Sequence, residues 1–321
     1  MDNKVDIKEN YIYHLDNQLL KILLKDHSSK NNIIWATDNY ASKGEGYCFK
    51  DYITIKNITG RNGLVIKPRT KKSQREQIKR IKEKAEVFTP SWVCNEQNNL
   101  IDNNWFQQEN VFNTPQNKTW ITNTNKIPFP QNKNWIDYVS ENRLEISCGE
   151  APYLISRYDT VTGEWIKIED RIGLLDRKLR VINENTVNLE DWFNWCLIAY
   201  KSIYGFEWQG DSLLIARENM LFTFMDYYVE RFGEMPPIEK TIEIAKIISW
   251  NLWQMDGLKF VIPESCKPEI KNQLSLFDND VTNHCRGCEI NNNKLHIGIY
   301  AIIKDWKTKK TKRFIDMIKE K

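Results

Sequence analysis

The chain has 321 residues, of which 41% are hydrophobic and 28% charged, as in globular rather than fibrous or disordered proteins. Its 46 basic residues nearly balance 43 acidic ones, so net charge alone gives little reason to expect an anionic partner. The polar start MDNKVDIKEN lacks the apolar core of a signal peptide, and no apolar run approaches the length of a membrane span. We therefore expect a cytoplasmic protein without membrane contact.

Residues 1–84 are predicted to form a small α+β region that ends in a basic helix. The helix-like LDNQLLKILLKD precedes the strand-like NNIIWATD and DYITIKNITG, and helix formers over 73–88 end at a proline. Basic residues crowd this helix and recur over 304–321, a distribution that suits a DNA phosphate backbone but also occurs on solvated helix faces. The DNA-binding candidates are Lys71, Lys72, Arg75, Lys79 and Arg80.

Residues 85–321 are predicted to form one α/β domain. Its first part, 103–137, is expected to be a long ordered loop. The tryptophans around it (Trp92, Trp105, Trp120 and Trp135) either pack that loop onto the core or stack on nucleobases. Strands are then predicted before residues 149, 208 and 256, and helices over 189–205, 211–233 and 238–250. Strands that alternate with helices favour a mostly parallel sheet.

The predicted strand ends carry residues suited to ligand binding. Small residues follow Glu145, an acid closes the second strand at Glu207, and a further acid follows the third at Asp256. Ligands of such sheets bind beyond the carboxyl ends of the strands, where a turn of small residues lets the backbone approach them.

These segments resemble a known enzyme family. The order AEVFTP, LEISCG, YGFE with LIAREN, then DGL, over roughly residues 85–260, resembles the γ-class DNA adenine-N6 methyltransferases of restriction-modification systems. The resemblance implies a Rossmann-like methyltransferase fold that binds S-adenosylmethionine. It implies a ribose contact at Glu207, an adenine contact at the Asp256 turn, and methionine contacts at FTP and the first loop. The implied cofactor residues are Phe88, Thr89, Pro90, Glu145, Ser147, Gly149, Glu207, Trp208, Asp256 and Leu258.

The chain also departs from that family. Ala151-Pro152 replaces the second glycine of the first loop, 157–188 is a long insertion, and the catalytic Asn-Pro-Pro-Tyr is absent. The chain ends where the strand bearing that motif is expected. We therefore expect no catalytic residue here, and a second polypeptide that completes a split, adenine-specific methyltransferase acting on double-stranded DNA in restriction-modification or phage defence. The alternative is an inactive methyltransferase fold that serves as a DNA-binding or scaffolding subunit.

Seven cysteines, an odd number, favour thiols or a metal over a disulfide framework. Cys266, His284, Cys285 and Cys288 are the predicted ligands of a structural zinc, because Cys-x-x-Cys presents two thiolates to one metal. Reduced thiols are the alternative. The other histidines have no partner at a telling spacing.

A metal-dependent restriction nuclease is a further alternative. Glu269-Ile-Lys271 has the Glu-x-Lys spacing of such enzymes, and Asp256 would be its upstream carboxylate. Pro263 and Pro268 nearby argue against a strand at this position.

Overall fold

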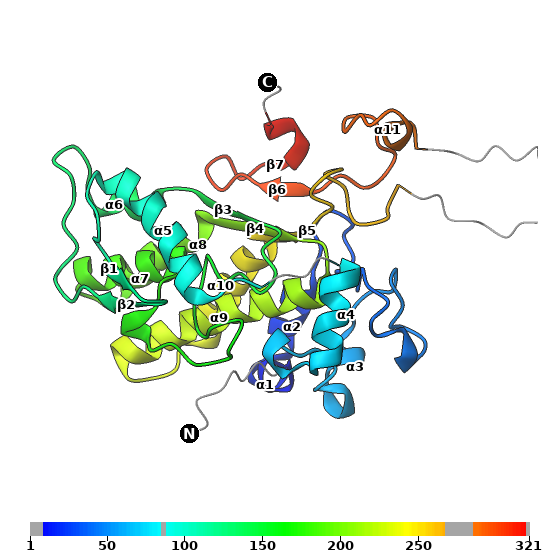
Figure 1. Cartoon of the computed structure of the whole chain (residues 1–321), viewed down its shortest axis with the longest axis horizontal. Coiled ribbons are helices and arrows are strands. Elements are labelled where there is room, and N and C mark those ends of the chain that lie inside the picture. The colour runs from blue at the N-terminus through cyan, green and yellow to red at the C-terminus, as the bar shows by residue number, and fades with distance from the viewer. Residues whose placement is uncertain (1–8, 85–87, 267–284, 319–321) are drawn as a thin grey trace, which may run out of the picture.

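The structure is a computed structural model that describes residues 9–84, 88–266 and 285–318 (Figure 1). Its helices are α1 Glu9–Leu15, α2 Asn17–Leu24, α3 Ile55–Ile58, α4 Gln74–Lys84, α5 Ser91–Phe106, α6 Trp135–Ser140, α7 Leu174–Asn185, α8 Leu189–Lys201, α9 Gly210–Phe232, α10 Ile238–Asn251 and α11 Arg286–Glu289. Its strands are β1 Asn113–Gln116, β2 Thr119–Thr122, β3 Arg143–Ile146, β4 Ile203–Glu207, β5 Leu252–Gln254, β6 Ile302–Lys304 and β7 Thr311–Arg313. Helices and small sheets mix, which confirms the α/β class.

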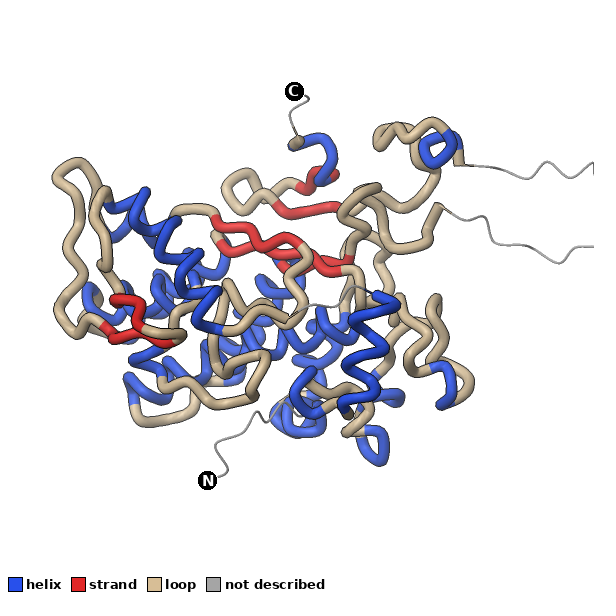
Figure 2. Tube along the Cα trace, in the orientation of Figure 1, coloured by secondary structure: helices blue, strands red, loops and turns tan. Residues whose placement is uncertain are grey.

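A parallel sheet with the order β3-β4-β5 lies at the centre of the fold. Helices α7 and α8 connect β3 to β4, and α9 and α10 connect β4 to β5. Helices α8, α9 and α10 lie on one side of this sheet, and the antiparallel β6–β7 hairpin lies on the other (Figure 2). Because the strands are parallel, their carboxyl ends meet at one edge of the sheet.

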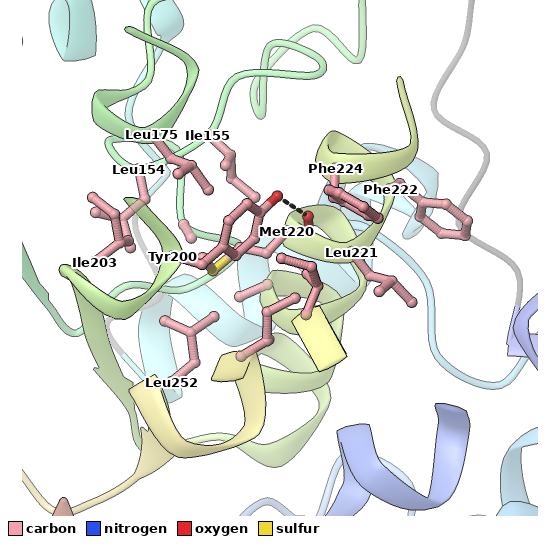
Figure 3. Close-up of a cluster of buried hydrophobic side chains, with 14 of the residues drawn as sticks. Leu154, Ile155, Leu175, Tyr200, Ile203, Met220, Leu221, Phe222, Phe224 and Leu252 are labelled. Atoms are coloured by element: carbon pink, nitrogen blue, oxygen red, sulfur yellow. Dashed lines mark hydrogen bonds between the residues drawn. The ribbon is translucent and has the colours of Figure 1, made fainter. Parts of the chain in front are cut away.

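Helix α9 occupies the middle of the hydrophobic core. Nearly all its residues from Gly210 to Tyr228 are buried, and the Tyr200 hydroxyl donates to the Met220 carbonyl at 2.9 Å (Figure 3). The same core cluster includes Ile12 and Trp35 from the N-terminal region. The core therefore crosses residue 84, and the division into 1–84 and 85–321 stays a prediction.

The first turn of α9 holds a buried ion cluster. Asp211 is fully buried and pairs with Arg80 of α4 and with Lys72, whose Nζ lies 3.7 Å away. The Tyr40 hydroxyl donates to the same carboxylate at 2.7 Å. Burial by itself would raise the pKa of Asp211, but Arg80, Lys72 and Tyr40 hold it at about 2. This cluster fixes α4 against α9.

Several predicted elements are confirmed. Helices α9 and α10 match the patterns at 211–233 and 238–250, and Gly233 ends α9 with a φ of 74°, a left-handed conformation that glycine favours. The helix predicted over 189–205 ends at Lys201 instead, because its last residues belong to β4.

Other expectations were wrong. The segment 103–137 is not a plain loop, since it contains the end of α5, the β1–β2 hairpin and the start of α6. The reason is a side-chain network, in which Asn113 bonds to Asn95 and Asn99 of α5. The strand-like N-terminal pieces form only isolated bridges such as Ile34 with Tyr52.

The segment 157–188, which we expected to be a long insertion, contains α7. Within the described ranges, no helix combines the length and apolarity needed to cross a bilayer.

We expect Asp211→Asn to destabilise the protein by about 3 kcal/mol at pH 7, because it removes a buried negative charge that pairs with two buried cations. The pKa of Asp211 is lowered on folding, so its ionisation stabilises the fold above about pH 4. About 2 kcal/mol of this stabilisation should disappear as the pH falls from about 4 towards 2. The difference between wild-type and variant unfolding free energies, measured in urea from pH 7 to 3, should shrink by about 1 kcal/mol, the part of this loss that occurs above pH 3.

The control is Asp316→Asn, which breaks an exposed ion pair with Arg313. It should change the unfolding free energy by less than about 0.5 kcal/mol. A comparable loss in both variants would mean that burial does not govern the Asp211 cluster.

Candidate functional site at the strand ends

Four segments distant in sequence meet at the carboxyl edge of the parallel sheet. The loop after β3 bonds to β4, since the N–H of Cys148 donates to the carbonyl of Phe206 at 2.9 Å. The N–H of Met255, after β5, donates to the carbonyl of Glu207 at 3.0 Å. Phe88 completes the set, because its ring would lie 3.9 Å from a Cβ added to Gly149. The fold thus gathers the segments that carry the family resemblance.

The loop after β3, residues 147–151, has an unusual backbone. Ser147, Gly149 and Ala151 have φ of 50°, 54° and 63°, all in the left-handed region. Ala151 therefore holds the conformation that glycine favours at the position where a second glycine was expected. An alanine with a positive φ stores backbone strain at this position.

Glu207 joins this loop to the turn after β4. Its carboxylate accepts from the N–H of Gly149 at 2.9 Å and from the N–H of Gln209 at 3.1 Å. Burial raises the pKa of Glu207, although these N–H groups counteract part of the effect. Glu207 is therefore a buried acceptor placed between two turns, with acceptor positions beyond the two bonds named here.

Glu145, on β3, is half-buried and accepts from the N–H of Leu154 at 3.2 Å. Burial raises the pKa of its carboxyl well above the ordinary value, and the charge of nearby Glu207 adds to the rise. Two carboxyl groups with raised pKa thus flank the loop. Carboxyl groups with shifted pKa values are common at functional sites, because folding buries ionisable side chains there.

The FTP segment packs on the other side of the same loop. Phe88 lies beside Gly149, and the guanidinium of Arg69 stacks 5.2 Å from its ring centre. The carbonyl of Thr89 accepts from the Thr160 hydroxyl at 3.0 Å, and Pro90 precedes the first residue of α5. All three FTP residues are half-buried at this edge.

The turn after β5 is closed by its own acid. Asp256 accepts from the N–H groups of Leu258 and Lys259 at 2.9 and 3.1 Å, and the Leu258 side chain is 83% exposed. Trp208 points towards the N-terminal region, where its indole N–H donates to the Ala36 carbonyl at 3.1 Å. Asp256 and Leu258 therefore line the edge, while Trp208 holds the turn in place.

The five DNA-binding candidates divide into two groups. Lys72 and Arg80 are buried against Asp211, so their charges stabilise the fold instead of facing solvent. Lys71, Arg75 and Lys79 are exposed. The sequence could not distinguish the buried cations from the exposed ones, because the acid that pairs with the buried ones lies on α9, far away in sequence.

A second candidate site is a group of metal-binding side chains. Cys266, Cys285, Cys288 and His296 place their ligand atoms within 4.8 Å of one another. The three sulfurs lie 3.5, 3.4 and 3.6 Å from Nδ1 of His296. A tetrahedral zinc with three sulfurs at about 2.3 Å and one nitrogen at about 2.0 Å would separate its ligand atoms by about 3.5 to 3.8 Å. The residues therefore fit a four-coordinate metal.

Local backbone geometry builds this metal-binding group. Gly287 lies between Cys285, which caps the start of α11, and Cys288 of α11, and a Cβ there would lie 2.6 Å from the His296 main-chain nitrogen. Only glycine allows this approach. Burial by itself would raise the pKa of the Cys285 thiol, but the N–H of Ile297 and the contacts with His296 and Cys288 lower it to about 6. The thiolate is the form that binds metals.

Sequence reasoning missed His296 and chose His284, which lies outside the described residues. The sequence did contain a clue to His296, because it is the first histidine after the Cys285-x-x-Cys288 pair, eight residues beyond Cys288. The nuclease candidates Glu269 and Lys271 also lie outside the described residues, and Asp256 caps its own turn.

The tryptophans mostly pack. Trp105 is buried among Phe106, Phe129 and Tyr138, and the Trp120 indole donates to the Asp170 carbonyl at 2.9 Å. Trp135 contacts Trp195 edge to face. These contacts favour the packing interpretation over base stacking.

The left-handed loop predicts opposite effects for two substitutions. Ser147→Gly should raise the unfolding free energy by about 0.5 kcal/mol, because it relieves strain at an exposed side chain. Gly149→Ala should lower it by about 1 kcal/mol, since Phe88 leaves room for a Cβ but the backbone does not favour one. Ser42→Gly, at an exposed serine outside the left-handed region, is the control and should not stabilise. Urea unfolding measures the unfolding free energy of all three variants. If Ser42→Gly stabilises the protein as much as Ser147→Gly does, backbone strain at Ser147 is not the cause.

Comparison with known proteins gave no matching family model, curated protein or solved structure. The strand-end site and the metal-binding group are therefore the observations from which a function can be proposed.

Proposed function

We propose that this chain is the S-adenosylmethionine-binding subunit of a split DNA adenine-N6 methyltransferase in a restriction-modification or phage-defence system. The observation that carries the proposal is the contact network at the carboxyl edge of the sheet. Phe88 lies against Gly149, Gly149 bonds to Glu207, and the main chain of Glu207 bonds to the turn that holds Asp256. These are the segments whose order resembles the γ-class family.

The arrangement of strands supports a Rossmann-like fold. The order β3-β4-β5, with helical crossovers, is that of one half of a doubly wound sheet, in which ligands bind beyond the carboxyl ends. The open loop 147–151 and the FTP segment would receive the methionine end of the cofactor. Glu207 would accept from the ribose hydroxyls, and the Asp256 turn would contact the adenine.

Each residue then has a physical task. Glu207 fixes the loop through Gly149 and keeps acceptor capacity for a diol. The edge of loop 147–151 exposes Ser147 and leaves Gly149 half-buried beside the ring of Phe88. When bound, S-adenosylmethionine supplies an activated methyl group. This chain supplies position and desolvation, which account for much of the catalysis of an in-line transfer.

The target base and the catalytic motif come from outside this chain in our proposal. A second polypeptide with Asn-Pro-Pro-Tyr would hold the flipped adenine and accept hydrogen bonds from its amino group. Double-stranded DNA would meet the exposed cations of the α4 region, Lys71, Arg75 and Lys79. An inactive subunit that only binds DNA is the outcome if the cofactor does not bind.

We further propose that Cys266, Cys285, Cys288 and His296 bind a structural zinc. Three of the four are buried, and no open coordination position is needed to complete a tetrahedron. The metal would join the segment after β5 to the segment around α11, which lie far apart in sequence.

The cofactor proposal predicts the effect of Glu207→Ala. Calorimetric titration with S-adenosylmethionine should give more than about tenfold weaker binding than wild type, a loss of at least about 1.4 kcal/mol. Glu207→Gln keeps an oxygen that can accept from the Gly149 N–H. This variant therefore shows whether weaker binding comes from the lost negative charge or from the lost hydrogen bond that holds the loop. Glu230→Ala, at an exposed acid on α9, is the matched control and should bind normally. Equal affinities in all variants would remove Glu207 from the site.

The metal proposal predicts about one zinc per chain in protein purified without chelators. Cys288→Ser should lose most of the metal and lower the thermal unfolding midpoint, because a structural zinc contributes directly to folding free energy. Cys48→Ser changes an exposed cysteine away from the group and should keep the metal. Elemental analysis and calorimetry measure both effects, and equal zinc content in the two variants would contradict the ligand set.

A further inference from the structure

The central sheet has an open edge at β3. Within the described residues β3 pairs only with β4. The N–H of Arg143, the first residue of β3, donates to the carbonyl of Ser202, the residue before β4. Residues along a parallel strand alternate the side to which their main-chain groups point, so Leu144 and Ile146 direct theirs away from β4. A further strand could bond there.

One face of the sheet is also uncovered beside this edge. Leu144 and Ile146 are 46% and 68% exposed, and they pair in register with Tyr204 and Phe206 of β4. Phe314, just after β7, covers Phe206 and neighbouring Trp253 with ring centres 6.1 and 5.3 Å apart. The cover from the β6–β7 hairpin thus protects β4 and β5 and stops before β3. Parallel sheets are normally buried on both faces.

A groove of about 590 Å³ lies between the β6–β7 hairpin and the start of β3, where Leu144 lines it. Leu144, Tyr204, Trp253 and Phe314 give it an apolar wall. The charged residues that line it are Arg143, Lys201, Lys304, Lys307 and Lys312, with Asp305 as the opposite charge. An occupant that buries apolar side chains in the wall and presents acids to these cations would complement the groove.

We propose that the second polypeptide adds a parallel strand to the open edge of β3 and covers Leu144 and Ile146 with an apolar, acid-flanked surface. This inference rests on the proposed function, since it places the partner of the split enzyme. The parallel direction matters, because the carboxyl end of the added strand would then lie beside loop 147–151. Catalytic residues that follow that strand would face the cofactor without any rearrangement of this chain.

The test is co-expression with the polypeptide of the neighbouring reading frame that carries Asn-Pro-Pro-Tyr, followed by affinity measurement. Ile146→Lys should weaken the complex by about 100-fold or more, because a charge would replace a central apolar contact at the edge. Ile121→Lys is the matched control, an isoleucine 60% exposed on β2, and should change the affinity less than about twofold. Amide hydrogen exchange at Leu144 and Ile146 should slow in the complex.

Three results would overturn the inference: no complex, a complex as tight with Ile146→Lys as with wild type, or unchanged exchange at residues 144 and 146. Sedimentation of the chain alone shows whether a second copy covers the edge instead. Titration with duplex DNA shows whether nucleic acid protects the groove, and either finding would refute the partner strand.

The proposed function can fail separately. A complex that protects β3 but transfers no methyl group to DNA would keep the docking inference and refute the methyltransferase. Methyl transfer by a complex that leaves β3 unprotected would do the reverse.

Discussion

A single buried guanidinium, that of Arg217 in the first half of α9, connects α9 with the end of α2 and with the junction of α10 and β5. It donates to the carbonyls of Leu23 and Lys25 at the end of α2, and to those of Ser249 and Leu252 where α10 passes into β5. Burial lowers its pKa to about 10, yet the cation persists because the carbonyls at two helix ends carry partial negative charge. Loss of this group would leave those carbonyls without a partner in the core.

The edge of the sheet that we propose as the cofactor site depends on the same helix. Helix α9 starts three residues after Glu207, and Asp211 in its first turn is fixed by Arg80, Lys72 and Tyr40. The turn between β4 and α9 is therefore held at both ends, by the sheet and by the ion cluster. Glu207 can then act as a fixed acceptor towards Gly149, and the strained loop 147–151 keeps its shape because a buried carboxylate holds it.

The C-terminal part has two proposed roles, to bind a metal and to form one wall of the groove, and both depend on how it packs on the central sheet. The β6–β7 hairpin places Phe314 over β4 and β5 and contributes cations to the groove. In sequence, the residues of the metal-binding group lie between the turn after β5 and this hairpin. A metal there would fix the cover of the sheet at the Asp256 side. The β3 side remains uncovered within the described residues, and this asymmetry is the basis on which we propose that a partner docks at that edge.

The sequence alone determined the periodic elements and the order of the strand-end motifs. Helices α9 and α10 were predictable because their apolar spacing is local, and so was the turn at Gly233. The carboxylates at 145, 207 and 256 were predicted to meet because parallel strands end at one edge. The Cys-x-x-Cys pair and Cys266 were visible as metal candidates for the same reason, that residue type and spacing express the chemistry.

Tertiary structure decided what depends on partners distant in sequence. Lys72 and Arg80 look like exposed cations until Asp211 of α9 pairs with them, and His296 looks unpartnered until the chain folds back on Cys266. Asn113 turns a polar loop into a hairpin by bonding to α5, and Ala151 adopts a conformation that its side chain disfavours. Each of these outcomes is set by long-range burial and hydrogen bonding, whose energies exceed the local preferences that a sequence displays.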